Sequence, residues 1–198
     1  MKHIDYYFWI NSDWAFLGAD WLEAIAARHD AQLNYLPVDL PYVYSRTGGI
    51  LLSRRAPERQ QYRITELKRF CAKLGIHINA LPRYMCPNGD FASRVVIAAK
   101  HRNLPLLVLT KAIFKAQWQD EQDISDVDTL LQIVSDTGFE AKALFAEAEA
   151  TAIEDEYRRN TEQAIAAGVF GSPSYVYRGE LFWGQDRLDF LDEALTED

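Results

Sequence analysis

The first forty residues carry the pattern that most limits the fold. Residues 4–10 read Ile-Asp-Tyr-Tyr-Phe-Trp-Ile, a short β-branched and aromatic run typical of a buried strand. Apolar residues then recur at steps of three and four, as on one face of a helix: Trp14, Leu17, Trp21, Leu22 and Ile25. A second strand is expected at residues 33–38. A strand–helix–strand unit normally forms two parallel strands with a right-handed crossover, which indicates an α/β fold.

The middle of the chain shows a helical period. A helix is expected from Pro57 to a stop at Gly75, because proline suits a first turn and glycine a helix end. Further helices are predicted at about 91–102, 106–117, 126–137, 140–148 and 150–167. Near the end, residues 174–177 and 180–183 alternate around Arg178-Gly179, which predicts a hairpin followed by a last helix. This order favours one domain with a mixed four-stranded sheet, formed by residues 1–45 and 168–198, and a helical insertion at about 56–167.

Composition excludes several classes of function. The chain of 198 residues has 21 Lys and Arg against 29 Asp and Glu, a net charge of −8, so nucleic acid is not an expected partner. No apolar run is long enough to cross a membrane, and Asp5 interrupts any signal-peptide pattern at the start. We therefore expect a cytoplasmic protein without a membrane partner.

Cysteine and histidine spacing gives no metal or redox motif. Cys71 and Cys86 lie fifteen positions apart with no Cys-x-x-Cys, and the four histidines are scattered, so no metal is expected. Cys86 is expected in an exposed loop without an activating neighbour. Gly-rich phosphate loops and a Gly-x-Ser-x-Gly elbow are absent as well.

Three places nevertheless suit ligand binding. Ser12 follows the first strand and precedes the helix, where it serves as an N-cap or helps to hold an anion, and the two roles are compatible. Residues 171–174 (Gly-Ser-Pro-Ser) form a turn before a strand, in which proline is ordinarily trans. Residues 183–187 (Trp-Gly-Gln-Asp-Arg) turn into the last helix. There Asp186 is a first-turn acid or the partner of an ammonium group, in a ligand such as an amino acid or a γ-glutamyl group.

A fourth feature is a basic segment in this acidic chain. Residues 46–69 hold seven Lys and Arg against two Glu. Such a segment is either a solvated helix face or a place that holds a substrate carboxylate.

Three motifs resemble one family. Residues 4–17 (Ile-Asp-Tyr-Tyr-Phe-Trp-Ile-Asn-Ser-Asp-Trp-Ala-Phe-Leu) resemble the opening of the 2-hydroxychromene-2-carboxylate isomerases, which are close to kappa-class glutathione transferases within the DsbA-like thioredoxin fold. Residues 168–176 (Gly-Val-Phe-Gly-Ser-Pro-Ser-Tyr-Val) and 179–188 (Gly-Glu-Leu-Phe-Trp-Gly-Gln-Asp-Arg-Leu) match the two C-terminal motifs of that family. The likeness spans nearly the whole chain, including residues 62–75.

The resemblance implies a fold and a cofactor. The fold would be α/β and thioredoxin-like (DsbA-like), with an inserted all-helical subdomain and Pro173 as a cis-proline facing the active site. Ser12 would replace the redox cysteine, and glutathione would supply the thiol. Its γ-glutamyl end would lie on Gly184, Gln185 and Asp186 beside Trp183, and its cysteinyl backbone would pair with Ser172.

The resemblance also implies a reaction. In the isomerases, the glutathione sulfur adds reversibly to a hydroxychromene carboxylate, the ring opens, a bond rotates, and elimination gives the trans open-chain product. Ser12 would stabilise the thiolate. The candidates for holding an acidic aromatic substrate, on charge and region only, are Arg54, Arg55, Arg83 and Asn88. Similar proteins are commonly dimers, so a homodimer is expected.

Some residues depart from the family pattern. The family has Pro after the serine, where this chain has Asp13, and an aromatic-Ser-Tyr where this chain has Trp14-Ala15-Phe16. Asp13 would oppose thiol ionisation by like-charge repulsion, or would point away and serve the helix dipole. Kappa-type proteins tend to have Gly-Asn where this chain has Gly48-Gly49.

Two alternatives stay open. A protein of the same fold could be a glutathione transferase or peroxidase that acts on xenobiotic electrophiles. A protein of another class would be a non-catalytic thioredoxin-like module that holds an extended peptide against the Pro173 edge.

Overall fold

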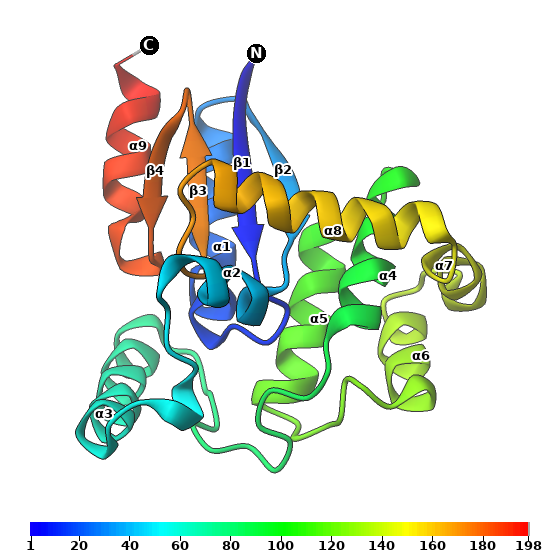
Figure 1. Ribbon diagram of the computed structural model, residues 1–198. Helices are drawn as coiled ribbons and strands as arrows, with labels where there is room; N and C mark the ends of the chain where they lie inside the picture. The colour runs from blue at the N-terminus through cyan, green and yellow to red at the C-terminus, as the bar shows by residue number, and fades with distance from the viewer. Residues whose placement is uncertain (198) are drawn as a thin grey trace.

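A mixed four-stranded sheet is the centre of the molecule (Figure 1). The computed structural model describes residues 1–197. The strands are β1 (Lys2–Phe8), β2 (Ala31–Pro37), β3 (Ser174–Tyr177) and β4 (Glu180–Trp183), in the spatial order β2-β1-β3-β4. β1 and β2 are parallel and are joined by α1 (Asp13–Arg28), whereas the other two pairs are antiparallel. The predicted strand–helix–strand unit and mixed sheet are therefore confirmed.

The predicted hairpin joins β3 to β4. Tyr177 pairs with Glu180, which leaves Arg178 and Gly179 as a two-residue turn. Both turn residues have positive φ, 51° and 83°, as tight hairpins require. The hairpin brings Trp183, at the end of β4, opposite Ser174 at the start of β3.

Helices cover both faces of the sheet. α1 and α9 (Leu188–Thr196) pack together on one face, and α8 (Thr151–Ala166) crosses the other (Figure 1). Successive side chains of β1 point to opposite faces of the sheet and so contribute to both layers. Tyr6 and Phe8 belong to the large core on the α1 face, while Tyr7 packs with Ala164 of α8.

The remaining helices extend the larger core away from the sheet. They are α3 (Pro57–Leu74), α4 (Asp90–His101), α5 (Leu106–Trp118), α6 (Val127–Asp136) and α7 (Ala141–Ala148), with short 3₁₀ turns η1 (Leu52–Arg54) and η2 (Gln185–Arg187). The Phe114 ring of α5 lies 6.2 Å from Phe8 in β1 and 5.9 Å from Phe16 in α1, measured between centroids. Sheet and helices thus share one apolar cluster. The division at residues 45, 56 and 167 stays a prediction.

One helix was not expected from the sequence. α2 (Leu40–Thr47) follows β2 directly. The Asp39 side chain caps it by accepting a hydrogen bond of 3.1 Å from the Tyr42 N–H, Pro41 lies in its first turn, and Gly48 ends it at φ 79°. No element had been predicted between the second strand and Pro57, so this helix is an addition to the predicted order.

α3 is attached to the rest of the molecule along a narrow stripe. Only Arg63 and Leu67 are buried among its eighteen residues. The Phe70 ring adds an edge contact with Trp14 of α1, with 5.8 Å between centroids. In Figure 1 this helix lies below the sheet, beside the start of α1.

Candidate functional site

Ser12 lies at the junction of β1 and α1. It is the N-cap of α1, and its Oγ accepts a hydrogen bond of 3.1 Å from the Ala15 N–H. The same hydroxyl donates to the Ser172 carbonyl at 3.3 Å. The predicted cap is confirmed. Because the N-terminus of a helix carries partial positive charge, an anion beside this hydroxyl is favoured.

The bend before β3 lies against Ser12. The Ser172–Pro173 peptide bond is cis. The family resemblance implied a cis bond, whereas the general preference of proline predicts a trans bond. The Ser172 Oγ accepts a hydrogen bond of 2.8 Å from the Trp9 N–H. Ladder pairing of β3 begins at Ser174, so the backbone of Ser172 lies outside the sheet ladder.

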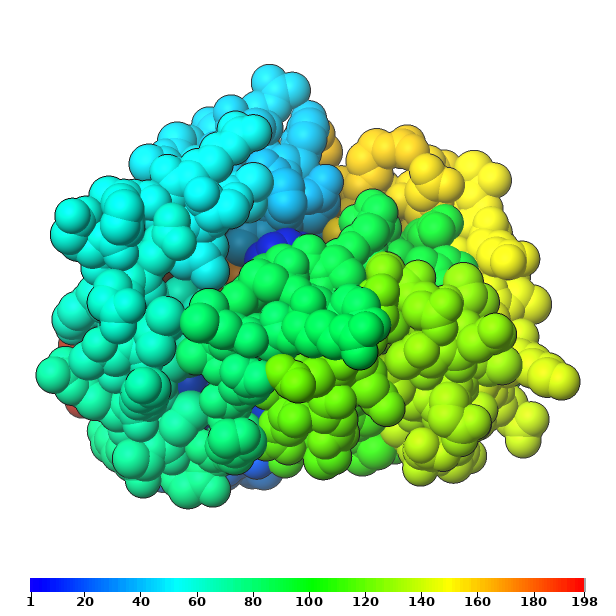
Figure 2. All heavy atoms as spheres, turned by 90° about the horizontal axis from the view of Figure 1, so that it is seen from below, coloured from blue at the N-terminus to red at the C-terminus, as the bar shows by residue number. Residues whose placement is uncertain are grey.

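A cavity of about 560 Å³ opens over these residues, and we call it the serine cavity. Ser12 and Ser172 line it, and α2, the segment after α2, α3 and the loop before α4 supply its walls. Figure 2 looks into this side of the molecule and shows blue N-terminal atoms at the bottom of a hollow between cyan and green segments. The cavity is large enough for a small organic ligand.

Asp13 also lines the serine cavity, and it does not point away from it. Its carboxylate forms a buried ion pair with Arg63 of α3 and accepts a hydrogen bond of 2.9 Å from the Trp14 N–H. Burial raises the pKa of Asp13, while Arg63 and the Trp14 N–H act in the opposite direction. The expectation that Asp13 points away from the site was wrong, whereas its place as an acid in the first turn of α1 is confirmed.

Cys86 brings a protein thiol into the same cavity. It lies in a loop, as expected, but its side chain is partly buried and not exposed. Its backbone has φ 52°. Burial raises its pKa to about 11, Asp13 adds to that rise, and Arg63 opposes it. Cys86 is therefore mostly protonated at neutral pH, which agrees with the expectation that nothing activates it.

The departure at Gly49 has a steric reason. A Cβ at position 49 would collide with the ring of Tyr44, which lines the serine cavity. Asparagine, which kappa-type proteins have at this position, does not fit here while Tyr44 keeps its place. The Tyr44 hydroxyl accepts a hydrogen bond of 3.4 Å from Arg55, which also donates to the Ile50 carbonyl at 2.8 Å.

Of the four candidate substrate residues, the structure brings one into the serine cavity. Arg55 lines it. The other three lie outside its lining: Arg54 lies in η1, the Arg83 guanidinium stacks on Tyr84 at 5.2 Å, and Asn88 accepts a hydrogen bond from the Asp90 N–H. Charge and region alone do not distinguish a cavity arginine from its neighbour in the chain.

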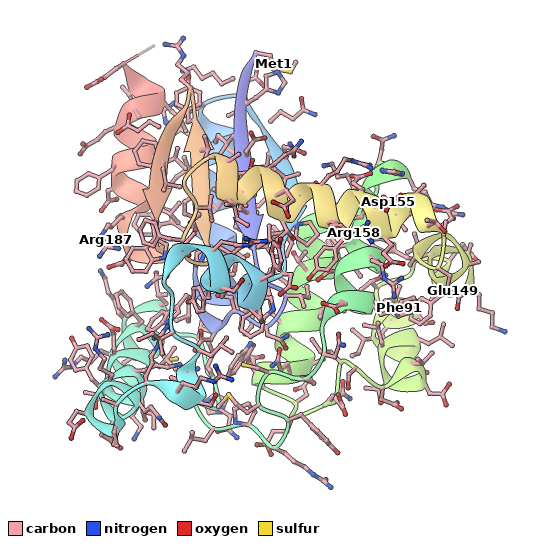
Figure 3. All side chains as sticks on the ribbon, viewed as in Figure 1. Met1, Phe91, Glu149, Asp155, Arg158 and Arg187 are labelled. Carbon is pink, nitrogen blue, oxygen red and sulfur yellow. The ribbon has the colours of Figure 1, made fainter. Side chains whose placement is uncertain are left out.

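The corner after β4 lies next to the bend but borders a second cavity. The Gly184 N–H donates to the Pro173 carbonyl at 3.0 Å, so corner and bend are in contact. Gln185 and Asp186, however, line a separate cavity of about 430 Å³ that we call the corner cavity, whereas Trp183 packs against Phe170. Figure 3 shows the neighbouring Arg187 at this corner, on the side of the molecule opposite Phe91 and Arg158.

The two cavities are neighbours across an aromatic pair. Trp14 lines the serine cavity, its contact partner Phe70 lines the corner cavity, and both rings lie between α1 and α3. The corner cavity also contains one cation, Lys73, and two anions, Asp186 and Asp189. This charge pattern suits a zwitterionic group.

Residues 1–197 were searched for clusters of metal-ligating side chains and for membrane-spanning helices. Within residues 1–197, no group of three or more His, Cys, Asp or Glu side chains is arranged to hold a metal ion. In the same described part of the chain, no helix has the length and apolarity needed to span a bilayer.

We compared the sequence with models of known protein families. The model of the DSBA-like thioredoxin domain matches residues 3–196. The chain belongs to the DSBA-like thioredoxin family. The predicted DsbA-like fold is thereby confirmed.

Relatives support the resemblance over the full length. A 2-hydroxychromene-2-carboxylate isomerase from Sphingobium xenophagum is 28% identical over 197 residues, 99% of each chain. A protein of the same name from Pseudomonas putida is 26% identical, covering 97% of this chain and 93% of its own. A solved structure of a 2-hydroxychromene-2-carboxylate isomerase superposes with a TM-score of 0.85 at 22% identity, covering 98% of this chain and 95% of that one.

Sequence reasoning missed two residues of the serine cavity. Arg63 was one of seven basic residues in a segment, and its partner Asp13 lies fifty positions away. Trp118 lines the cavity from the end of α5 with its indole Nε1 buried and without a hydrogen-bond partner among the described residues. No local pattern reveals either residue, because both reach the site through tertiary packing.

Proposed function

We propose that this protein is a glutathione-dependent isomerase of aromatic carboxylates, similar to 2-hydroxychromene-2-carboxylate isomerase. The observation that carries the proposal is the position of the Ser12 hydroxyl, at the N-terminus of α1 on the serine cavity. The names of the full-length relatives support the same reaction.

The residues present fit glutathione. In the corner cavity, Lys73 can pair with the γ-glutamyl carboxylate and Asp186 with its ammonium group. The backbone of Ser172, outside the sheet ladder, is available to a peptide that adds along the bend. The hydrogen bond between Gly184 and Pro173 holds the corner beside the bend.

Glutathione would supply the nucleophilic thiol, which adds to the substrate and leaves again after bond rotation. The residues of this chain have three tasks. Ser12, whose hydroxyl donates to the Ser172 carbonyl, would donate to the sulfur of a bound thiolate instead, and α1 adds partial positive charge there. Arg55 attracts the substrate carboxylate. The aromatic walls, including Trp9 and Trp118, exclude water from the ring.

Two measurements test the proposal. Calorimetric titration of the full chain with reduced glutathione should show binding, and purified protein should isomerise 2-hydroxychromene-2-carboxylate only when glutathione is present. Turnover of a chlorinated nitrobenzene without isomerisation would favour the transferase alternative. A folded protein that does not bind millimolar glutathione would contradict both enzymatic functions and leave the peptide-binding module.

A further inference from the structure

Asp13 occupies a position at which a carboxylate is expected to impair a thiol site. It follows Ser12 directly, in the first turn of α1, and it lines the same cavity. A negative charge this close disfavours ionisation of a neighbouring thiol. The geometry around Asp13 shows how the chain accommodates it.

Arg63 reaches Asp13 from α3 and is held by three kinds of contact. One Nη pairs with the Asp13 carboxylate, the other donates to the Ala80 carbonyl at 3.1 Å, and the guanidinium lies over the Trp118 ring, 5.7 Å from its centroid. Both partners of the ion pair are buried, with side-chain exposures of 9% for Arg63 and 7% for Asp13. The guanidinium is therefore held beside Asp13 by contacts with α1, the segment after α3 and α5.

The charge balance of the serine cavity depends on this pair. Five titratable side chains line the cavity, one from each of five segments: Asp13, Tyr44, Arg55, Arg63 and Cys86. Burial raises the pKa of Tyr44, so it stays neutral, and Cys86 is mostly protonated. With Asp13 and Arg63 cancelling each other, the remaining positive contributions come from Arg55 and the N-terminus of α1.

We propose that Arg63 is a positioning residue whose guanidinium cancels the Asp13 carboxylate, so that a thiol docked beside Ser12 meets the positive end of α1. This inference rests on the proposed function for the identity of the thiol. It adds a role for α3: the helix completes the electrostatics of the site when it packs against α1. The proline that the family has after the serine needs no such partner.

The test compares four variants of the full chain: Asp13→Asn, Arg63→Gln, Arg63→Lys and the double variant Asp13→Asn/Arg63→Gln. Matched controls remove an exposed charge from the same two helices, Asp20→Asn on α1 and Arg69→Gln on α3. Circular dichroism and thermal unfolding establish that each variant is folded. The main readout is the pKa of the bound glutathione thiol, followed by the ultraviolet absorbance of the thiolate.

The two single changes should move this pKa in opposite directions. Asp13→Asn leaves the guanidinium uncompensated and should lower the thiol pKa by about one pH unit, and Arg63→Gln should raise it by a similar amount. The double variant should lie between them, and Arg63→Lys should stay close to wild type because it keeps the charge. A purely structural role predicts shifts in one common direction, or none, in the folded variants, and either result would overturn the inference.

Cys86 gives a second readout that does not need glutathione. Below its pKa, the thiolate fraction at fixed pH rises about tenfold for each unit by which the thiol pKa falls, and the lower nucleophilicity of the weaker base offsets this gain in alkylation rate only in part. Asp13→Asn should therefore speed alkylation of Cys86 by iodoacetamide, and Arg63→Gln should slow it, with the controls unchanged. If glutathione does not bind the wild type, the proposed function fails while this readout still tests the charge balance. Equal rates in all folded variants would refute the charge balance even if glutathione binds.

Discussion

At the residue scale, Ser12 combines a structural task with the chemical task that we propose for it. Its hydroxyl caps α1 through the Ala15 N–H and lies on the cavity floor next to Ser172. The sequence was sufficient to predict the cap, because a serine between a strand and an amphipathic helix is a typical N-cap. The sequence was not sufficient to predict the ion-pair partner of Asp13, because Arg63 lies fifty positions away in the chain.

Ser12→Ala separates the two tasks. We expect isomerase turnover to fall about a hundredfold through loss of the donor to the thiolate, with a loss of about 1 kcal/mol in the free energy of unfolding from the missing cap. Kinetic assays and urea denaturation measure the two effects. Asp126→Ala, which removes the side-chain cap of α6 far from the cavity, is the matched control and should keep full turnover. Unchanged turnover in folded Ser12→Ala would leave Ser12 as a cap only.

Asp39 provides a test of pH dependence. Burial raises the pKa of this carboxyl in the folded protein, against the opposing hydrogen bond from the Tyr42 N–H. Between the pKa of this carboxyl in the unfolded chain and its higher pKa in the folded protein, the folded state binds more protons than the unfolded state. The free energy of unfolding therefore falls as the pH rises through this range. Asp39→Asn keeps the cap and removes the charge. Urea denaturation should show this variant to be more stable than wild type at pH 7, with the difference vanishing below the unfolded pKa of about 3.9. A variant less stable at pH 7 would contradict the expected sign.

At the element scale, the helices with a clear apolar period were predictable and α2 was not. The three- and four-residue period of Leu67, Phe70 and Cys71 is sufficient to identify α3, and Gly75 ends it with φ 67° as expected. α2 has eight residues, of which only Leu40 and Val43 are buried, so it has almost no period to detect. Its end signals, Asp39, Pro41 and Gly48, are present in the sequence, but each is also common in turns.

Gly49→Ala tests how α2 shapes the serine cavity. The added methyl group meets the Tyr44 ring, and such overpacking costs about 1–3 kcal/mol of stability. We expect the same change to cost much less in a Tyr44→Ala background, because the colliding ring is absent. Thermal or urea unfolding of the four proteins in this cycle gives the coupling between the two positions. Equal costs in both backgrounds would show that Tyr44 is not what excludes a side chain at position 49.

At the scale of the whole molecule, sheet and inserted helices share one core. Phe114 of α5 contacts the rings of Phe8 and Phe16, so the insertion and the sheet depend on each other. We expect Phe114→Ala to lower the free energy of unfolding by about 3–5 kcal/mol, with a single transition seen by far- and near-ultraviolet circular dichroism. Phe190→Ala, at an exposed position of α9, should change little. Two separate transitions would show that the helical segment unfolds as an independent unit.

The whole-molecule arrangement brings the bend and the corner to Ser12, where we propose that the protein uses the sulfur of a bound glutathione. The most direct measurement is a crystal structure of the complex with reduced glutathione. We predict electron density with the sulfur within hydrogen-bonding distance of the Ser12 Oγ, the cysteinyl backbone along Ser172, and the γ-glutamyl group in the corner cavity with Lys73 and Asp186. Glutathione bound with its sulfur away from Ser12, or no glutathione in either cavity at saturating concentration, would contradict the account.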